Sequence, residues 1–251
     1  MAIDELQLIA IETLYAALVI VPSLIIFYKT RGLYNFSGYK GLRYFSNAFL
    51  FISLGFFLRY IVIVNKVLAG DPMGTIQTFD LLVIGMEFFI VLTGMFLLYS
   101  VAWKRFETKR YSKNLVNLPV LLIYITALII AFIDFILETF ILLYSSQIVF
   151  FSIASVITYR NYSKKRIYSR QFMFMSMFLF LVVMVINFIA QVTIDQYPLM
   201  RFYAYLITVI AVFIFLYITS KLTGRRPVFE LRKDKKYKKS KKNKKGNSKN
   251  G

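Results

Sequence analysis

Residues 118–159 read LPVLLIYITALIIAFIDFILETFILLYSSQIVFFSIASVITY, an apolar stretch whose only charged side chains are Asp134 and Glu138. Strongly basic segments border it on both sides, KRFETKRYSK at 104–113 and RNYSKKRIYSR at 160–170. Lys and Arg in short loops of membrane proteins stay on the cytoplasmic side, so an even number of crossings must separate these two segments. A span needs about 20 apolar residues. The stretch is therefore expected to hold two spans.

Basic charge alternates in the same way along the whole chain. Of the 31 Lys and Arg residues, 28 fall in four segments, 29–43, 104–113, 160–170 and 221–251. Every second gap between the apolar runs is nearly free of basic charge, which is the positive-inside pattern of a protein that crosses a membrane repeatedly. The pattern predicts seven spans, an outside amino terminus and a cytoplasmic carboxyl terminus. The expected spans are 6–28, 44–64, 81–103, two within 118–159 that meet in a tight turn near 137–139, 171–194 and 202–220.

The composition places the chain among integral membrane proteins. Apolar residues make up 59% of it and the mean hydropathy is +0.64, far from the balance of soluble domains. The runs are continuously apolar and do not alternate with a period of two, so helices are expected and a β-barrel is not. We therefore predict an all-α, multi-pass bundle in the cell (plasma) membrane, with a seven-helix domain at 6–223 and a tail at 224–251.

The chain has neither cysteine nor histidine. The first absence excludes thiolate chemistry, and the second removes the commonest general base and the commonest metal ligand. We expect no metal site and no enzymatic activity, because carboxylates alone would have to supply the chemistry. No cofactor is expected either. A retinal protein needs a Schiff-base lysine at mid-depth of its last span, whereas 202–220 contains none and Lys221 lies only at its inner edge.

The tail at 224–251 carries most of the net positive charge. It holds ten Lys and three Arg against Glu230 and Asp234, which is +11 of the total of +19. Low hydrophobicity and high like charge predict a disordered segment that contacts anionic phospholipid, as the basic inner loops also should. Nucleic acid or ribosome contact is less favoured, because Tyr237 is the only aromatic residue among the later lysines. The tail residues expected to contact lipid are Arg225, Arg226, Lys235, Lys236, Lys238 and Lys239.

Three charged residues lie within the expected spans, on the outer side. Glu12, Arg59 and Glu87 each fall about 6 to 10 Å below the predicted outer surface, at the helical rise of about 1.5 Å per residue. An ionisable side chain in a membrane is costly unless it is paired or hydrated, so each is a candidate site residue. The simplest arrangement places Arg59 between the two carboxylates, because a guanidinium can donate hydrogen bonds to both.

Further polar residues recur at helical spacing on the spans. Asp134, Gln147, Asn187 and Gln191 are the supporting candidates, and polar stripes should face the bundle interior because lipid cannot satisfy them. The expected result is a polar cavity in the outer half of the bundle, where a small ligand or ion binds. Two alternatives remain open. The charges could form a structural clasp that fixes helix packing, or a path for protons or ions.

The sequence also suggests a weak internal repeat, which the residue matches alone do not establish. It would give a three-plus-one-plus-three arrangement with parallel halves, a plan found in transporters. The matched residues are Arg43, Phe45, Phe51 and Leu54 against Arg170, Phe172, Phe178 and Leu181, and Phe96 against Phe215.

No motif ties the chain to a known family, and three functions remain. The first is a heptahelical sensor or small-ligand-binding protein. The second is a secondary transporter that uses the carboxylates to couple cation or proton movement, which the repeat would favour. The third is a structural or assembly protein without a ligand.

Overall fold

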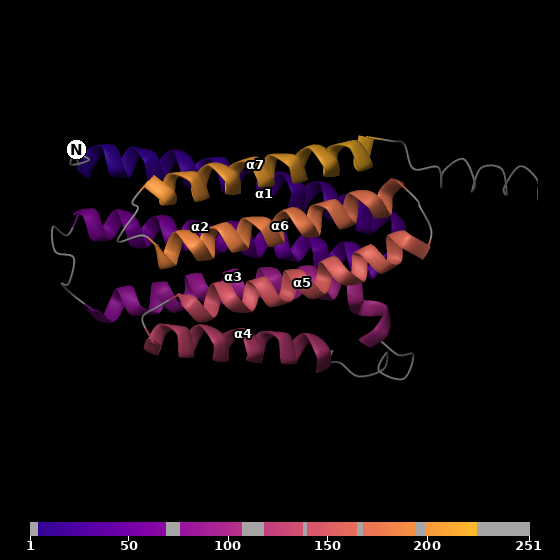
Figure 1. Cartoon of the computed structure of the whole chain (residues 1–251), viewed down its shortest axis with the longest axis horizontal. Coiled ribbons are helices and arrows are strands. Elements are labelled where there is room, and N and C mark those ends of the chain that lie inside the picture. The colour runs from indigo at the N-terminus through magenta and orange to yellow at the C-terminus, as the bar shows by residue number, and fades with distance from the viewer. Residues whose placement is uncertain are drawn as a thin grey trace, which may run out of the picture.

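The computed structural model describes residues 5–68, 76–106, 118–137, 140–164, 168–193 and 199–224. This part of the chain forms seven helices, all long and apolar enough to cross a membrane, which confirms the expected all-α, multi-pass architecture (Figure 1). Which end of the bundle faces the cytoplasm stays a prediction. The helices are α1 (Glu5–Ser37), α2 (Lys40–Leu68), α3 (Ile76–Phe106), α4 (Leu118–Leu137), α5 (Ile141–Lys164), α6 (Tyr168–Val192) and α7 (Leu199–Gly224).

The long apolar stretch between the two basic segments is divided as the charge pattern requires. α4 ends at Leu137 and α5 begins at Ile141. Asp134 stabilises the junction, because its carboxylate accepts hydrogen bonds from the backbone N–H groups of Leu142, at 2.9 Å, and Leu143, at 3.0 Å. These donors have no partner within the first turn of a helix, so the carboxylate caps the N-terminus of α5.

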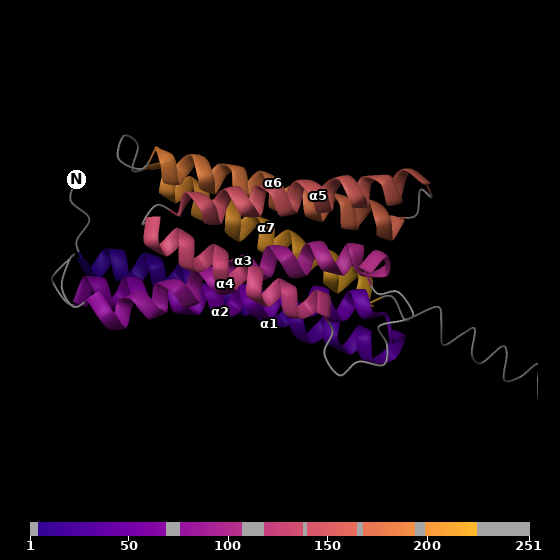
Figure 2. The ribbon, with the colours of Figure 1, turned by 90° about the horizontal axis from the view of Figure 1, so that it is seen from below.

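Six of the seven helices form a closed ring. Going round it, α1 packs against α2, α2 against α3, α3 against α5, α5 against α6, α6 against α7, and α7 returns to α1. α4 lies outside this ring and packs only against α3 and α5 among the described helices (Figures 1 and 2). The interior of the bundle is therefore enclosed without α4.

α4 has the sequence of a helix that meets lipid on most of its surface. Its buried residues are Ile123, Ala127, Ala131 and Asp134, spaced four, four and three apart, which makes one narrow stripe. The small residues in that stripe allow a close approach to α3 and α5. Large apolar side chains cover the other faces and are exposed, among them Leu121, Leu122, Ile125, Leu128, Ile129, Phe132, Ile133 and Ile136.

Aromatic rings fill the centre of the ring of helices. Phe215 of α7 lies 4.4 Å from Phe180 of α6 and 5.5 Å from Phe49 of α2, measured between ring centroids. Phe151 of α5 stacks on Phe180 at 5.2 Å. All four side chains are buried. Because lipid tails are as apolar as the core, this close van der Waals packing is what favours contact between helices over contact with lipid.

The order of neighbours in the ring is compatible with two halves. If α1, α2 and α3 are matched to α5, α6 and α7, every contact between neighbours in the ring has a counterpart, and α4 becomes the linker. The matched residues agree less well. Phe96 and Phe215 are both 1% exposed, but Phe51 is 9% exposed whereas Phe178 is 50% exposed. Any ring of six helices that follow one another along the chain can be matched in this way, and the side-chain environments agree only in part, so the repeat stays a prediction.

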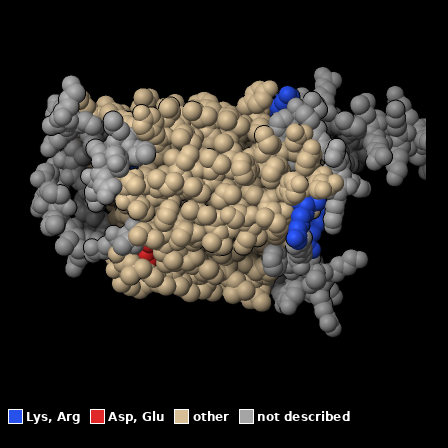
Figure 3. All heavy atoms as spheres, viewed as in Figure 1, with Lys and Arg blue, Asp and Glu red and all other residues tan. Residues whose placement is uncertain are grey.

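The two ends of the bundle differ in charge. Lys29, Lys40, Arg43, Lys104 and Arg160 lie at the end where α1 finishes, which we call the basic end. The end where α1 begins is the amino-terminal end. Figure 3 shows Lys and Arg at one end of the visible face and a wide uncharged band between the two ends. The hydrocarbon core of a bilayer requires such a band.

Candidate functional site

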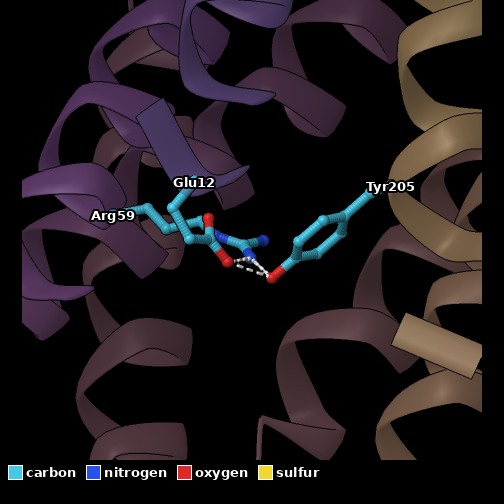
Figure 4. Close-up of polar contacts among 3 residues, drawn as sticks. All are labelled: Glu12, Arg59 and Tyr205. Carbon is cyan, nitrogen blue, oxygen red and sulfur yellow. Dashed lines mark hydrogen bonds and ion pairs between the residues drawn. The ribbon is translucent and has the colours of Figure 1, made fainter. Parts of the chain in front are cut away.

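Three helices are tied together near the amino-terminal end by a cluster that we call the clasp, formed by Glu12 of α1, Arg59 of α2 and Tyr205 of α7 (Figure 4). Arg59 Nη2 lies 3.5 Å from Glu12 Oε1 and also donates to the Tyr205 hydroxyl oxygen. The Tyr205 hydroxyl in turn donates to Glu12 Oε1 at 2.5 Å. Each member of the clasp therefore contacts the other two.

The guanidinium of Arg59 lies over the aromatic rings of Tyr15 and Tyr205. The rings of Tyr15 and Tyr205 stack, with centroids 4.1 Å apart and an interplanar angle of 7°. Arg59 Cζ lies 5.2 Å from the centroid of Tyr15 and 4.8 Å from that of Tyr205. A cation over aromatic faces is stabilised electrostatically, more so where water is excluded. One carboxylate and two aromatic rings therefore stabilise the partly buried cation of Arg59.

Glu87 is not the second partner of Arg59, so the expected pairing of Arg59 with two carboxylates is wrong for this residue. Among the described residues, Glu87 forms no ion pair with Arg59, and its Oε2, fully buried, has no hydrogen-bond partner. The reason is rotation about the axis of α3. Met86 and Ile90 face Gly55 of α2, and Glu87 is turned about 100° from Met86. Its carboxyl group comes within electrostatic range of Asp134 on α4.

The four supporting polar residues lie in different places. Asp134 caps α5 and is 1% exposed. Asn187 donates from Nδ2 to Thr208 Oγ1 of α7 at 3.2 Å, less than one turn from Tyr205, and so lies beside the clasp. Gln191, near the end of α6, is half-buried. These residues do not converge on one ligand site with Glu12 and Arg59.

Gln147 of α5 is the most unusual of them. Its side chain is fully buried, and neither Oε1 nor Nε2 has a hydrogen-bond partner among the described residues. It faces Gly94 of α3, where an added Cβ would overlap the amide group. Gly94 therefore provides the space for Gln147. A buried amide with no partner costs free energy, and such a group is often kept for a function.

A cavity of about 520 Å³ opens at the basic end. All six helices of the ring contribute to its wall, and α4 does not. Apolar side chains such as Leu33, Phe45 and Phe215 form about half of the lining. The polar part consists of Lys104, Asn161 and the hydroxyl groups of Thr30, Ser100, Thr158, Ser176 and Thr219.

The cavity lies at the end opposite to the one expected from sequence. None of Glu12, Arg59 and Glu87 is among its lining residues. At the amino-terminal end, the clasp and the stacked rings of Tyr15 and Tyr205 occupy the space between α1, α2 and α7. At the basic end, five of the residues that line the cavity are Ser or Thr, whose small side chains leave room between the helices. The charged residues led to the prediction of a cavity at the amino-terminal end. The position of the cavity at the basic end depends instead on the volumes of the side chains between the helices.

The predicted site residues do not include Tyr205, Lys104 or the cavity residues Thr30, Ser100 and Thr219. Tyr205 lies only four residues from Arg201, at the end of α7 that belongs to the amino-terminal end of the bundle. Its depth therefore matches that of Glu12. Lys104 was treated only as part of a basic loop. The basic tail residues from Arg225 to Lys239 lie outside the described residues, and their contact with lipid stays a prediction.

No family model matches the chain, and no solved structure matches it. The chain is similar to an uncharacterized protein of Archaeoglobus fulgidus, with 38% identity over 61 residues. The aligned stretch covers 24% of this chain and 27% of that relative. A likeness of this extent shows no family. It leaves the site itself as the basis for a functional argument.

Proposed function

We propose that the chain is a small-ligand-binding membrane protein of the sensor class, with its ligand in the cavity at the basic end. The main support is the make-up of the cavity, because six helices line it. A ligand that contacts all of them favours one arrangement of the ring over the others, which is how binding shifts a conformational equilibrium. Its volume of about 520 Å³ falls within the usual range for small-molecule sites, about 300–1,000 Å³.

Ligand binding in the cavity can change the geometry of the clasp, because the two share helices. α1, α2 and α7 carry the clasp near one end and also line the cavity at the other. A movement of these helices at the basic end therefore changes the clasp, whose polar groups have few alternative hydrogen-bond partners in a membrane. We propose a protein without enzymatic activity and without retinal, in which ligand binding and clasp geometry are coupled.

The proposal is tested by thermal unfolding of the full chain in an uncharged detergent, in the presence of a panel of small anionic, cationic and uncharged solutes. At least one solute should raise the melting temperature. Ser176→Phe, which fills the cavity, should abolish that rise, whereas Ser163→Phe at an exposed position of α5 should keep it. Absence of any stabilising solute, or stabilisation that survives Ser176→Phe, would reject the proposal and favour a structural role.

A secondary transporter is the second candidate, and a specific observation favours it. Polar groups line a space that is open at the basic end, while the clasp joins the helices at the amino-terminal end. Access from one side at a time is the requirement of alternating access, and a three-plus-one-plus-three arrangement, which the sequence suggests, is a plan found in transporters. In this case the clasp is the gate that opens when the cavity closes.

The transporter candidate predicts solute flux in proteoliposomes. Tyr205→Phe removes a hydroxyl that joins Glu12 to Arg59 and should change the flux several-fold. Tyr203→Phe, on the same helix but 58% exposed, should leave it unchanged. Equal flux in protein-free and protein-containing vesicles for every solute that stabilises the protein would reject transport and leave the sensor proposal standing.

A further inference from the structure

Among the described residues, one cationic side chain, that of Lys104, lines the cavity at the basic end, and no described carboxylate pairs with it. The buried acidic side chains of that part of the chain, Glu12, Glu87 and Asp134, all belong to the other half of the bundle. An ammonium group without a counter-charge attracts an anion, and the neighbouring basic residues at this end strengthen the attraction.

Two aromatic residues position the ammonium group of Lys104. Its Nζ lies 5.5 Å from the ring centroid of Tyr39 and 5.8 Å from that of Trp103. The two rings pack edge to face at 5.4 Å. Lysine is a flexible point charge, and contact with two rings that hold each other restricts where its charge can lie.

Trp103 carries a hydrogen-bond donor directly behind Gly41, a lining residue of the cavity, although Trp103 itself does not line it. Its buried Nε1 has no hydrogen-bond partner among the described residues. The atom lies next to Gly41, a lining residue at which an added Cβ would come within 2.9 Å of Nε1 and 2.8 Å of the Ser100 carbonyl oxygen. An unpaired indole N–H near an ammonium group favours a ligand that accepts hydrogen bonds.

Three hydroxyl groups of the wall have the opposite preference. Thr30 Oγ1 donates to Ile26 O at 2.7 Å, Ser100 Oγ to Leu97 O at 2.7 Å, and Thr158 Oγ1 to Ala154 O at 2.8 Å. Each proton is used within its own helix, so each oxygen has only lone pairs left for a ligand. All three residues line the cavity and are at most 3% exposed. They form a wall that accepts hydrogen bonds.

We propose that this cavity binds an anion that carries hydroxyl groups, of the polyol-phosphate class. The phosphate lies at Lys104, and the hydroxyl groups of the ligand donate to Thr30, Ser100 and Thr158. The assignment rests on the proposed function and gives its ligand a chemical class. The apolar wall leaves two sources for the same chemistry, a free polyol phosphate or the headgroup of a lipid whose chains lie against Leu33 and Phe215.

The test uses the full chain in an uncharged detergent, and Trp103, its single tryptophan, as the reporter. Four probes separate the contributions: glycerol 1-phosphate, dihexanoyl phosphatidylglycerol, glycerol without the phosphate, and inorganic phosphate without the polyol. One or both of the first two should change the emission of Trp103 saturably, and glycerol and inorganic phosphate should bind at least about tenfold more weakly. Binding of dihexanoyl phosphatidylglycerol alone identifies a lipid headgroup as the ligand. Binding of glycerol 1-phosphate, with or without the lipid, identifies the free solute.

Matched substitutions assign the binding to the cavity. Lys104→Gln should weaken it about tenfold, the usual effect of losing one charge-assisted hydrogen bond. Arg160→Gln removes the same charge from a residue of α5 that is exposed, as Lys104 is, but does not line the cavity, and it should change binding less than about twofold. Equal binding of glycerol and glycerol 1-phosphate, insensitivity to Lys104→Gln, or no binding of any probe would overturn the assignment.

The failure of this assignment is distinguishable from failure of the proposed function. If a cationic or uncharged solute stabilises the protein and Ser176→Phe abolishes the effect, the cavity is a ligand site of a different class. If neither the four probes nor any solute of the panel acts through the cavity, the assignment and the proposed function both fail.

Discussion

The hydroxyl group of Tyr205 lies 2.5 Å from Glu12 Oε1, so the last helix of the bundle is tied to the first through a carboxylate that also pairs with Arg59. This contact closes the ring of six helices near its amino-terminal end. The cavity lies at the opposite end, between the same helices. The account therefore predicts a bundle with one closed end and one open end.

Removal of one charge from the clasp should cost more than removal of both. Arg59→Met leaves the Glu12 carboxylate buried without a cation, and we expect a loss of about 3 kcal/mol, the lower end of the range for buried pairs, because the Arg59 side chain is 18% exposed. Arg59→Met combined with Glu12→Gln should cost less than Arg59→Met alone. The melting temperatures of both single variants and the double variant provide the measurement. A double variant that loses as much as the two single variants together would show that the pair is not coupled.

Gly94→Ala should destabilise the protein because its Cβ overlaps the Gln147 amide. The expected loss is about 1–3 kcal/mol, the usual cost of overpacking a core. Gln147→Ala in the same chain removes the overlap and should restore most of that loss. Thermal unfolding of the single and double variants measures the effect. If Gly94→Ala is neutral on its own, the two helices do not approach as closely as described.

Asp134 should act mainly as the N-terminal cap of α5. Asp134→Ala leaves the N–H groups of Leu142 and Leu143 unpaired and should cost about 0.5–2 kcal/mol. Asp134→Asn keeps one oxygen acceptor and should cost less. Neither variant should alter ligand binding at the basic end. A larger effect on binding than on stability would give Asp134 a role beyond the cap.

The orientation of the bundle is tested by two cysteines introduced into a chain that has none. Gln7→Cys and Ser37→Cys place thiols at exposed positions of opposite ends of α1. In intact cells, a membrane-impermeant maleimide should label the first and should label the second only after permeabilisation, because the basic end is predicted to face the cytoplasm. Labelling in the reverse order would invert the topology and place the cavity outside.

The fold could be predicted because the positions of basic residues and the lengths of apolar runs can both be counted along the sequence. Two basic segments fixed the parity of crossings, and this alone divided the stretch that contains Asp134 into α4 and α5. Depth in the membrane also follows from counting residues, which brought Glu12 and Arg59 together. Rotation about a helix axis is harder to obtain from a single sequence. Glu87 has the same depth as its expected partner but lies on another face of α3, within range of Asp134.

The cavity could not be predicted, because empty space depends on how side chains of different volumes meet. Tyr15 and Tyr205 fill the amino-terminal end by stacking, and nothing in either residue type indicates that they face each other. Ser176 and Thr219 leave space at the basic end, but Ser and Thr at the ends of spans are also common where helices simply pack. The sequence indicated which residues are polar, and the arrangement of the ring decided which of them face a cavity.

The rate at which a buried thiol reacts tests the account most directly. Ser176→Cys places a thiol in the wall of the cavity, and Ser23→Cys places one at a fully buried position of α1 outside it. Purified protein in an uncharged detergent is treated with a small charged thiol reagent, and the extent of modification is followed by mass spectrometry. The account predicts that Ser176→Cys reacts many times faster than Ser23→Cys and is protected by any solute that stabilises the protein. Equal rates for the two thiols, or a thiol of Ser176→Cys that does not react, would contradict it.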